Sequence, residues 1–459
     1  MFNFLGYVSD AFDVLCAIGG FILSLWWIWV PWFLFALARD LWFKHINDKA
    51  AQKKDWVLLE IIPPRDIKKT PKAMEQIFAG LHGVQGWGHW VDRNIDGIIP
   101  DYFSLELISN EGEIRFLVRV ITRYRNLVES NIYAQYPEAE ITEVDDYVNL
   151  VPDDIPNKDY DLWGTELVLL KEDAYPIRTY ADFEKDIILD EQRIDPVASL
   201  LETMTNIMAG ERIWVQTLIR PVGDTWKKEG EKVINELLGR KEEKKQGILM
   251  KEAIGWKDAS KEVAHQFVTG NPLDMEVKEE SKNKDFDLLK NMTKGEREVV
   301  EAIEKNISKI GYEVIIRYVY LCRKDDYRGG SIKRAIMGCY KQFNTQNLNG
   351  FGYNRDISPG IDYRIQMKKI RDVYRKKRVF NDYKKRDFVN HSGFYTWLRP
   401  LFFEYWPILN WFFIRSKPFV LNTEELATVF HFPAEPVKTP LTPKVEAKKS
   451  EPPRGLPVG

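Results

Sequence analysis

Cysteine is scarce in this sequence, and its few copies lie far apart. The chain has 459 residues and three cysteines, Cys16, Cys322 and Cys339. No two of them have the Cys-x-x-Cys spacing that a zinc ribbon or a dithiol redox motif requires. Cysteine usage therefore excludes both kinds of site and fits a protein of a reducing compartment.

A strong net charge is also lacking. The 66 lysines and arginines oppose 68 aspartates and glutamates, which leaves a formal net charge of -2. A chain so evenly balanced has no overall field that would draw it to nucleic acid or to anionic lipid. Any such binding must come from a local patch of basic side chains.

Catalytic motifs are missing as well. The chain contains no Gly-x-x-x-x-Gly-Lys-Ser/Thr phosphate loop, no Gly-x-Ser-x-Gly elbow and no His-Glu-x-x-His zinc motif. We therefore predict no enzymatic activity, no cofactor and no metal. Three groupings contain residue types that bind a metal, a cation or phosphate, but a structural role is favoured for each. Residues 83–97, with His82 and His89, favour a flexible loop rather than a metal site. Asp145, Asp146, Asp153 and Asp154 favour a solvated loop rather than a cation site, and Arg115, Arg119, Arg123 and Arg125 favour a solvated sheet face rather than a phosphate site.

One long apolar run is present near the N-terminus. Residues 14–38 contain no charged side chain and include several tryptophans. A run of this length is typical of a transmembrane helix, which needs about 20 apolar residues, and the lysines that follow in residues 39–55 favour a cytoplasmic C-terminal side. The sequence predicts a single-pass protein of the cell membrane, with its N-terminus outside and its soluble region in the cytoplasm. A buried core helix is the alternative.

The next hundred residues predict an α+β domain. Residues 56–62 read as a strand, 72–81 as a helix after Thr70 and Pro71, and 102–108 and 114–121 as a hairpin. A second helix to about Tyr136 and a strand at 139–144 complete the order strand, helix, strand, strand, helix, strand. We therefore predict a ferredoxin-like domain over residues 56–150.

The same order recurs in the next two hundred residues. Strands are expected at 165–170, 211–220 and 312–321, and helices at 196–208 and 332–343. The stretch 223–309, rich in lysine and glutamate, separates the hairpin strands and contains a capping box at Thr293 and Glu296. The pattern indicates a second ferredoxin-like domain, 160–355, with a charged helical insertion at 223–309.

A basic run and an aromatic cluster follow in residues 356–432, before a proline-rich tail, 433–459. The aromatic cluster holds Trp397, Trp406 and Trp411, predicted to contact a membrane or a partner. The basic run 366–386 fits contact with anionic lipid or with a nucleic-acid backbone, lipid being favoured and a merely exposed charged helix being the alternative. The basic residues proposed for this contact are Lys368, Lys369, Arg371, Arg375, Lys376, Lys377 and Arg378.

Several stretches resemble one bacterial and archaeal family: Trp56-Val-Leu-Leu-Glu-Ile-Ile, Pro71-Lys-Ala-Met-Glu-Gln-Ile-Phe-Ala-Gly-Leu-His, Tyr124-Arg-Asn-Leu-Val-Glu, Ile132-Tyr-Ala-Gln-Tyr-Pro, Phe343-Asn-Thr-Gln-Asn-Leu-Asn and Leu421-Asn-Thr-Glu-Glu-Leu-Ala. The family is a domain of unknown function, found alone behind a membrane helix or N-terminal to HerA-like and conjugation-type ATPases of type IV secretion systems. The resemblance covers roughly residues 56–459 and carries no catalytic residues over to this chain.

The resemblance implies a scaffold rather than an enzyme. We expect a membrane-anchored accessory subunit that positions a separate DNA- or protein-translocating ATPase at the cytoplasmic membrane. The expected partners are the lipid bilayer and that ATPase, with a second copy of the chain as a further candidate. The alternative function is a membrane-tethered nucleic-acid-binding module that acts through residues 366–386.

Overall fold

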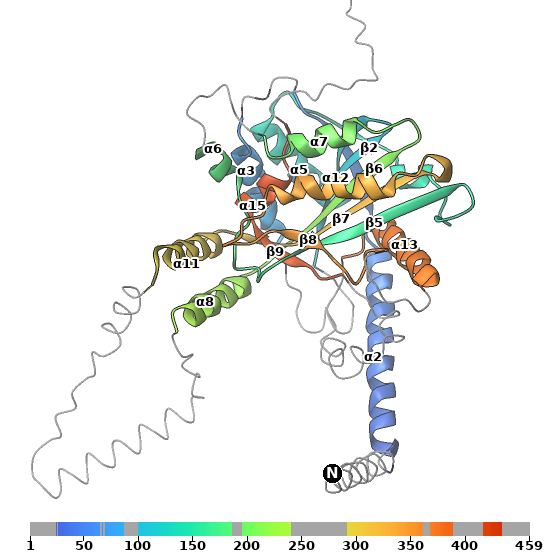
Figure 1. Ribbon diagram of the computed structural model, residues 1–459, viewed down its shortest axis with the longest axis horizontal. Coiled ribbons are helices and arrows are strands. Elements are labelled where there is room, and N and C mark those ends of the chain that lie inside the picture. The colour runs from blue at the N-terminus through green and yellow to red at the C-terminus, as the bar shows by residue number, and fades with distance from the viewer. Residues whose placement is uncertain are drawn as a thin grey trace, which may run out of the picture.

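A nine-stranded antiparallel sheet organises the fold in the computed structural model (Figure 1). The structure describes residues 26–64, 69–86, 100–185, 195–239, 292–360, 368–388 and 416–433, together with 24 and 67. The strands are β1 (Trp56–Ile62), β2 (Phe103–Asn110), β3 (Glu113–Ile121), β4 (Glu140–Glu143), β5 (Tyr160–Leu169), β6 (Arg212–Pro221), β7 (Gly311–Arg323), β8 (Phe351–Tyr353) and β9 (Phe419–Asn422).

The helices cover both faces and one end of the sheet. They are α2 (Trp26–Gln52), α3 (Lys72–Leu81), α5 (Arg125–Gln135), α6 (Tyr180–Lys185), α7 (Ala198–Thr205), α8 (Thr225–Leu237), α11 (Lys294–Ile307), α12 (Gly329–Lys341), α13 (Lys368–Lys385) and α15 (Thr423–Val429). Short 3-10 turns occur at η1 (His82–Val84), η2 (Thr122–Tyr124), η3 (Tyr147–Leu150) and η5 (Lys324–Asp326).

The sheet consists of two halves joined edge to edge. Its strand order is β4-β1-β3-β2-β6-β7-β5-β8, with β9 added beside β7. Each half follows the succession strand, helix, strand, strand, helix, strand, with α3 and α5 in the first half and α7 and α12 in the second. The halves meet where β2 pairs with β6, from Phe103 opposite Ile219 to Asn110 opposite Arg212. The two domains expected from the sequence thus share one continuous sheet.

Local sequence signals account for several element boundaries. The β2–β3 turn places Glu111 and Gly112 at φ values of 55° and 93°, where glycine is favoured because it has no Cβ. Helix α11 begins with the capping box of Thr293 and Glu296, in which each side chain binds the other residue's backbone N–H. Residues close in the sequence therefore determine both boundaries, the turn through its backbone conformation and the helix start through its hydrogen bonds.

The main core lies between one face of the sheet and helices α3, α5, α7, α12 and α15. Alternate residues of the central strands point into it, for example Phe103, Leu105 and Leu107 of β2. The intervening residues of β2 point to the opposite face, where α13 and η3 cover a second core that includes Leu162, Trp214, Val319 and Phe380. Because both faces are covered, seven of the eight residues of β2 are buried.

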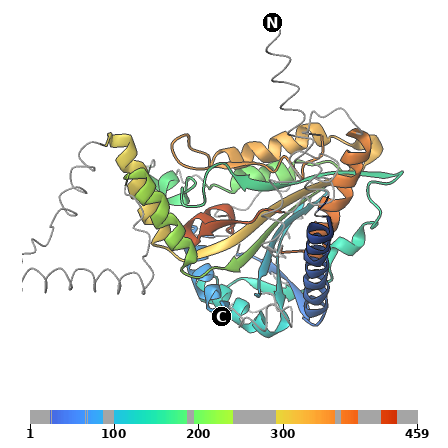
Figure 2. The same cartoon turned by 90° about the horizontal axis from the view of Figure 1, so that it is seen from below.

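Helices α8 and α11 pack side by side at one end of the sheet, as Figure 2 shows. Their contact is apolar and includes Trp226, Ile234, Val300 and Ile303. These helices belong to the insertion expected between the strands now identified as β6 and β7, while residues 240–291 of it lie outside the described residues.

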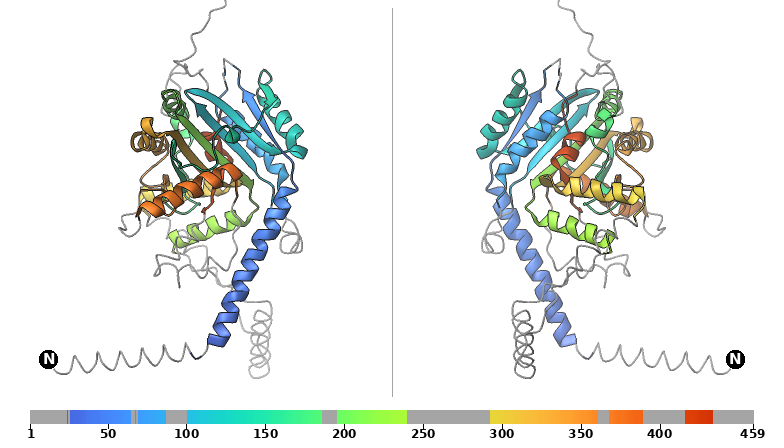
Figure 3. Two further views of the ribbon diagram at one scale, coloured as in Figure 1. Left: turned by 90° about the vertical axis from the view of Figure 1, so that its right-hand side faces the viewer. Right: turned by 90° about the vertical axis from the view of Figure 1, so that its left-hand side faces the viewer.

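Helix α2 corrects the expectation of a transmembrane segment. It projects from the body of the fold (Figure 3) and runs unbroken from Trp26 to Gln52, so the charged residues Arg39, Asp40 and Lys44 belong to the same helix. Of the predicted span 14–38, residues 14–23 and 25 lie outside the described part. No helix among the described residues combines the length and the apolar character that crossing a bilayer needs. The predicted transmembrane helix, and the single-pass cell-membrane localisation derived from it, are therefore wrong.

Two helical glycines, one at the contact between α8 and α11 and one on α12, should respond in opposite ways to substitution by alanine. A Cβ on Gly230 of α8 would lie 2.4 Å from Cγ2 of Ile307, whereas a Cβ on Gly338 of α12 would meet no atom within 4 Å. We expect Gly230→Ala to lower the free energy of unfolding by about 1–3 kcal/mol through overpacking. Gly338→Ala should raise it by about 0.5–1 kcal/mol, because alanine favours the helix. Urea unfolding measured by circular dichroism distinguishes the two, and equal effects of both substitutions would contradict the described packing.

Candidate interaction face and the ion network beneath it

Helix α13 lies across the sheet face formed by β5 and β7. Its inward side chains, Val379, Phe380 and Tyr383, are buried in the second core. Gly164 of β5 permits this close approach, since a Cβ there would lie 2.7 Å from Cγ1 of Val379. The helix is therefore fixed on the sheet by its apolar side.

The seven basic residues predicted as a contact site divide between the interior and the surface. Arg371 and Arg375 are only 3% and 5% exposed. Lys376 donates to Oδ1 of Asp161 over 2.6 Å, and Arg378 lies 3.5 Å from a carboxylate oxygen of Asp382. The remaining three, Lys368, Lys369 and Lys377, are exposed.

The outward side of α13 combines apolar and basic side chains. Ile370, Val373 and Tyr374 are 64%, 44% and 39% exposed, at a spacing that places them on one side of a helix. The two aspartates of the helix lie apart from this side, because Asp372 accepts a hydrogen bond from the Gly360 backbone N–H and Asp382 pairs with Arg378. We call the exposed residues on this side of the helix the α13 face: Lys369, Ile370, Val373, Tyr374, Lys377, Asn381 and Lys385. Lys368 is also exposed, but it lies two and a half turns before Lys377 and therefore on the opposite side of the helix.

Beneath α13, four polar residues lie side by side across the sheet. Strand pairing places Glu106 opposite Gln216, Gln216 opposite Arg317, and Arg317 opposite Glu166. All four are at most 2% exposed. Nε of Arg317 donates to Oε1 of Glu166 over 2.7 Å, and Nε2 of Gln216 donates to Oε1 of Glu106 over 3.4 Å. We call this set the polar row.

Arg386, just after α13, neutralises the Glu106 end of the polar row. Its guanidinium donates to both carboxylate oxygens of Glu106, and also to Asp146 over 2.7 and 2.9 Å. Burial lowers the pKa of Arg386, but the nearby Glu106 charge outweighs burial and holds this pKa above its ordinary value. Burial likewise raises the pKa of Asp146, yet its hydrogen bonds with Arg386 hold it below the usual range.

The residues at and just after the end of α13 also cover Arg317, the third residue of the polar row. The backbone carbonyl of Asp387 accepts from Nη2 of Arg317 over 2.8 Å, and Ser416 joins Arg317 to Glu166. Tyr147 and Tyr383 link their hydroxyls over 2.6 Å, and Tyr147 donates to Glu106. The last part of the basic run therefore belongs to the interior, which its sequence alone does not indicate.

The groupings weighed earlier as alternative sites are engaged within the fold. Arg115 pairs with Glu60, Arg123 with Asp101, and Arg125 with Glu129 and Glu143, while the Arg119 guanidinium stacks over the Trp56 ring. Among the acids, Asp146 pairs with Arg386 and Asp153 with Lys384. Nε2 of His82 lies 3.1 Å from the Val222 carbonyl oxygen, whereas His89 lies outside the described residues.

The aromatic residues predicted to contact a membrane or a partner cannot be placed on this framework. Trp397, Trp406 and Trp411 lie outside the described residues. Within the described ranges, no cluster of three or more histidine, cysteine or acidic side chains is arranged to hold a metal ion.

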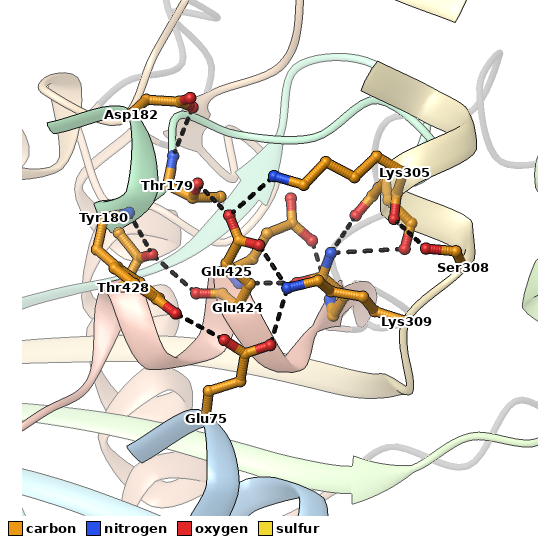
Figure 4. A network of polar contacts seen from close by, with 12 residues as sticks. Glu75, Thr179, Tyr180, Asp182, Lys305, Ser308, Lys309, Glu424, Glu425 and Thr428 are labelled. Carbon is orange, nitrogen blue, oxygen red and sulfur yellow. Dashed lines mark hydrogen bonds and ion pairs between the residues drawn. The ribbon is translucent and has the colours of Figure 1, made fainter. Parts of the chain in front are cut away.

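A second polar cluster joins α11 to α3 and α15 (Figure 4). Nζ of Lys309, just after α11, donates to Oε1 of Glu75 on α3 over 2.8 Å and also contacts Glu424 on α15. The hydroxyl of Thr179 donates to the same Glu424 carboxylate. The cluster therefore holds the helical insertion against the main body of the fold.

Glu425 forms the buried centre of this cluster. It closes a capping box with Asn422 and accepts the Ile177 backbone N–H over 2.8 Å. Burial raises the pKa of Glu425 to about 8, although the backbone hydrogen bonds favour its charged form. The nearby Asp173 has its pKa raised by burial to about 6. Glu425 thus binds a proton in the folded state at pH values where the unfolded chain has released it.

Comparison with known proteins identifies the family of the chain. A family model described as "Domain of unknown function (DUF8128)" matches residues 44–444. Neither a curated protein nor a solved structure matches the chain.

The polar row predicts a large effect of removing Arg386. Arg386→Met would leave Glu106, which is fully buried, without its cationic partner. We expect the free energy of unfolding to fall by about 3–5 kcal/mol, the usual effect of breaking a buried ion pair on one side. Lys385→Met, at an exposed neighbouring position, should change it by less than about 0.5 kcal/mol. Urea unfolding measures both, and a small effect at Arg386 would contradict its described role.

Glu425 predicts a pH dependence of stability. Its folded pKa of about 8 exceeds the ordinary value of 4.5, so the folded state binds more protons than the unfolded state between these values. Stability should therefore fall as the pH rises, by roughly 1–3 kcal/mol between pH 6 and pH 8. Asp173, with a folded pKa of about 6, changes its charge mainly between about pH 5 and pH 7, so it adds only a small part of the slope above pH 6. We expect Glu425→Gln to remove most of this slope in urea unfolding, and an unchanged slope would show that another group causes it.

Proposed function

The chain belongs to the family of the domain of unknown function DUF8128, and we propose that it is a non-enzymatic scaffold that binds a separate partner protein. The observation that carries this proposal is the α13 face, where three neighbouring apolar side chains are exposed among lysines on a helix fixed by its opposite side. Exposed apolar side chains that cluster with polar neighbours are typical of protein-binding surfaces.

The fixed position of α13 supports a binding role. The apolar contacts of Val379, Phe380 and Tyr383 hold the helix on the sheet, and Arg386 anchors its C-terminal end through buried ion pairs. A helix held in this way loses little conformational freedom when a partner binds, so less of the binding free energy is spent on ordering it.

The ion pairs formed by the buried acids support a scaffold rather than an enzyme. Glu106, Glu166 and Glu211 each bind an arginine of the same chain, namely Arg386, Arg317 and Arg328 respectively. A general base must be able to reach a substrate proton. Carboxylates enclosed with arginines in this way instead stabilise the fold.

The partner that we favour is a HerA-like or conjugation-type ATPase. The support for this partner is the resemblance of the sequence motifs described above, which implies an ATPase of this kind. In the assembly that we propose, the scaffold contributes position and the ATPase contributes nucleotide hydrolysis.

Nucleic-acid binding is the second candidate. The exposed lysines Lys369, Lys377 and Lys385 favour it, because they would give one side of α13 three positive charges toward a phosphate backbone. Ile370 and Val373 lie among these lysines, however, and a duplex backbone offers them no apolar contact.

The proposal predicts that charge reversal on the α13 face separates the scaffold from its partner. The tagged full-length chain, purified from its native cells, should retain a protein with ATPase activity. We expect K369E/K377E to lose that activity, while K227E/K228E on exposed positions of α8 retains it. The measurement is ATP turnover of the purified assembly, with duplex DNA content assayed in parallel. ATP turnover by the chain alone, or retention of DNA instead of an ATPase, would overturn the proposal.

A further inference from the structure

The α13 face has a single sign of charge, although the helix as a whole does not. Its residues are three lysines, three apolar side chains and one asparagine. Asp372 and Asp382 are only partly exposed and make contacts within the fold, and Lys376 is neutralised by Asp161. The charges of the helix are therefore sorted: its ion pairs lie at the border with the sheet, and the lysines of the α13 face form no ion pair with any residue that the structure describes.

We infer that this face binds an acidic amphipathic helix of the partner, with the apolar side of that helix against Ile370, Val373 and Tyr374. The inference rests on the proposed scaffold function and adds the chemistry of the binding segment. Opposite charges on the two surfaces would fix the register and the orientation of the contact.

The dimensions of the face agree with a helix as its ligand. At a rise of 1.5 Å per residue, Ile370 to Tyr374 covers roughly 6 Å, and Lys369 to Lys377 covers roughly 12 Å. Apolar residues on one side of a second helix, three or four positions apart, have the same spacing as the apolar group here. Acidic residues one turn away on each side would then come within reach of Lys369 and Lys377.

Other polyanions fit the face less well. A duplex would engage the lysines but leave Ile370 and Val373 against phosphates and sugars, with their apolar area still in contact with water. An anionic vesicle would accept the lysines, but only three partly exposed apolar side chains are present to enter its acyl region. An acidic amphipathic helix is the ligand that engages both kinds of side chain.

The test uses the purified full-length chain and a labelled, designed helical peptide of about 18 residues, long enough to span the face. The peptide has leucines on one side and glutamates elsewhere. A control peptide has the same composition, with the leucines distributed around the helix. Fluorescence anisotropy measures binding of both peptides, of a duplex DNA and of phosphatidylglycerol vesicles at the same salt concentration.

We expect the amphipathic peptide to bind roughly tenfold more tightly than its control, and more tightly than the duplex or the vesicles. I370S/Y374S should weaken peptide binding by roughly tenfold through loss of apolar contact, and K369E/K377E should abolish it. K227E/K228E on α8 should leave it unchanged. The thermal unfolding of each variant establishes that it is folded.

Three results would overturn the inference: equal binding of the two peptides, tighter binding of duplex or vesicles, or full peptide binding by I370S/Y374S. The proposed scaffold function fails separately, if the charge-reversal variant still retains the partner ATPase. If the charge-reversal variant loses the ATPase but the unmodified chain does not bind the peptide, the inference of an acidic helix as ligand is overturned and the scaffold function stands.

Discussion

The buried charge of Glu106 is the constraint on which the position of α13 depends. A carboxylate at 0% exposure is tolerated only with a partner that supplies both charge and hydrogen bonds. Arg386 supplies both, from a position 280 residues later in the chain. Because Arg386 follows directly after α13, the ion pair fixes one end of the helix over the sheet. The buried contacts of Val379 and Phe380 then determine which side of the helix faces outward.

This arrangement gives a basic segment two separate roles. Its arginines and two lysines, Lys376 and Lys384, complete the interior and its border. The exposed Lys369 and Lys377 lie beside Ile370, Val373 and Tyr374 and form no ion pair with any residue that the structure describes. Composition alone makes residues 366–386 resemble a uniformly solvated basic helix. Because one side of helix α13 packs on the sheet, only the opposite side, which carries lysines and apolar residues, faces solvent. The function proposed for the chain depends on that distinction.

The sequence predicted the elements better than their assembly. Helix α3 has the expected bounds, and the β2–β3 turn and the Thr293 capping box also lie where local signals place them. The pairing of β2 with β6 joins segments about a hundred residues apart and has no local signal. Alternation of Ser104 and Glu106 with apolar residues is typical of a solvated face, yet α13 and Arg386 cover that face. The apolar run near the N-terminus favoured a membrane span because the pattern did not show one helix continuing through Arg39 to Gln52.

The pairing of β2 with β6, which joins the two half-sheets, affects how readily other chains can add to the edges of the sheet. Pairing these strands removes two long edges that would otherwise offer unpaired backbone groups to other chains. The outermost strands of the resulting order, β4 and β8, have only four and three residues. Strands this short are poor templates for strand addition, so the two ends of the strand order offer little backbone to which another chain could add by edge pairing.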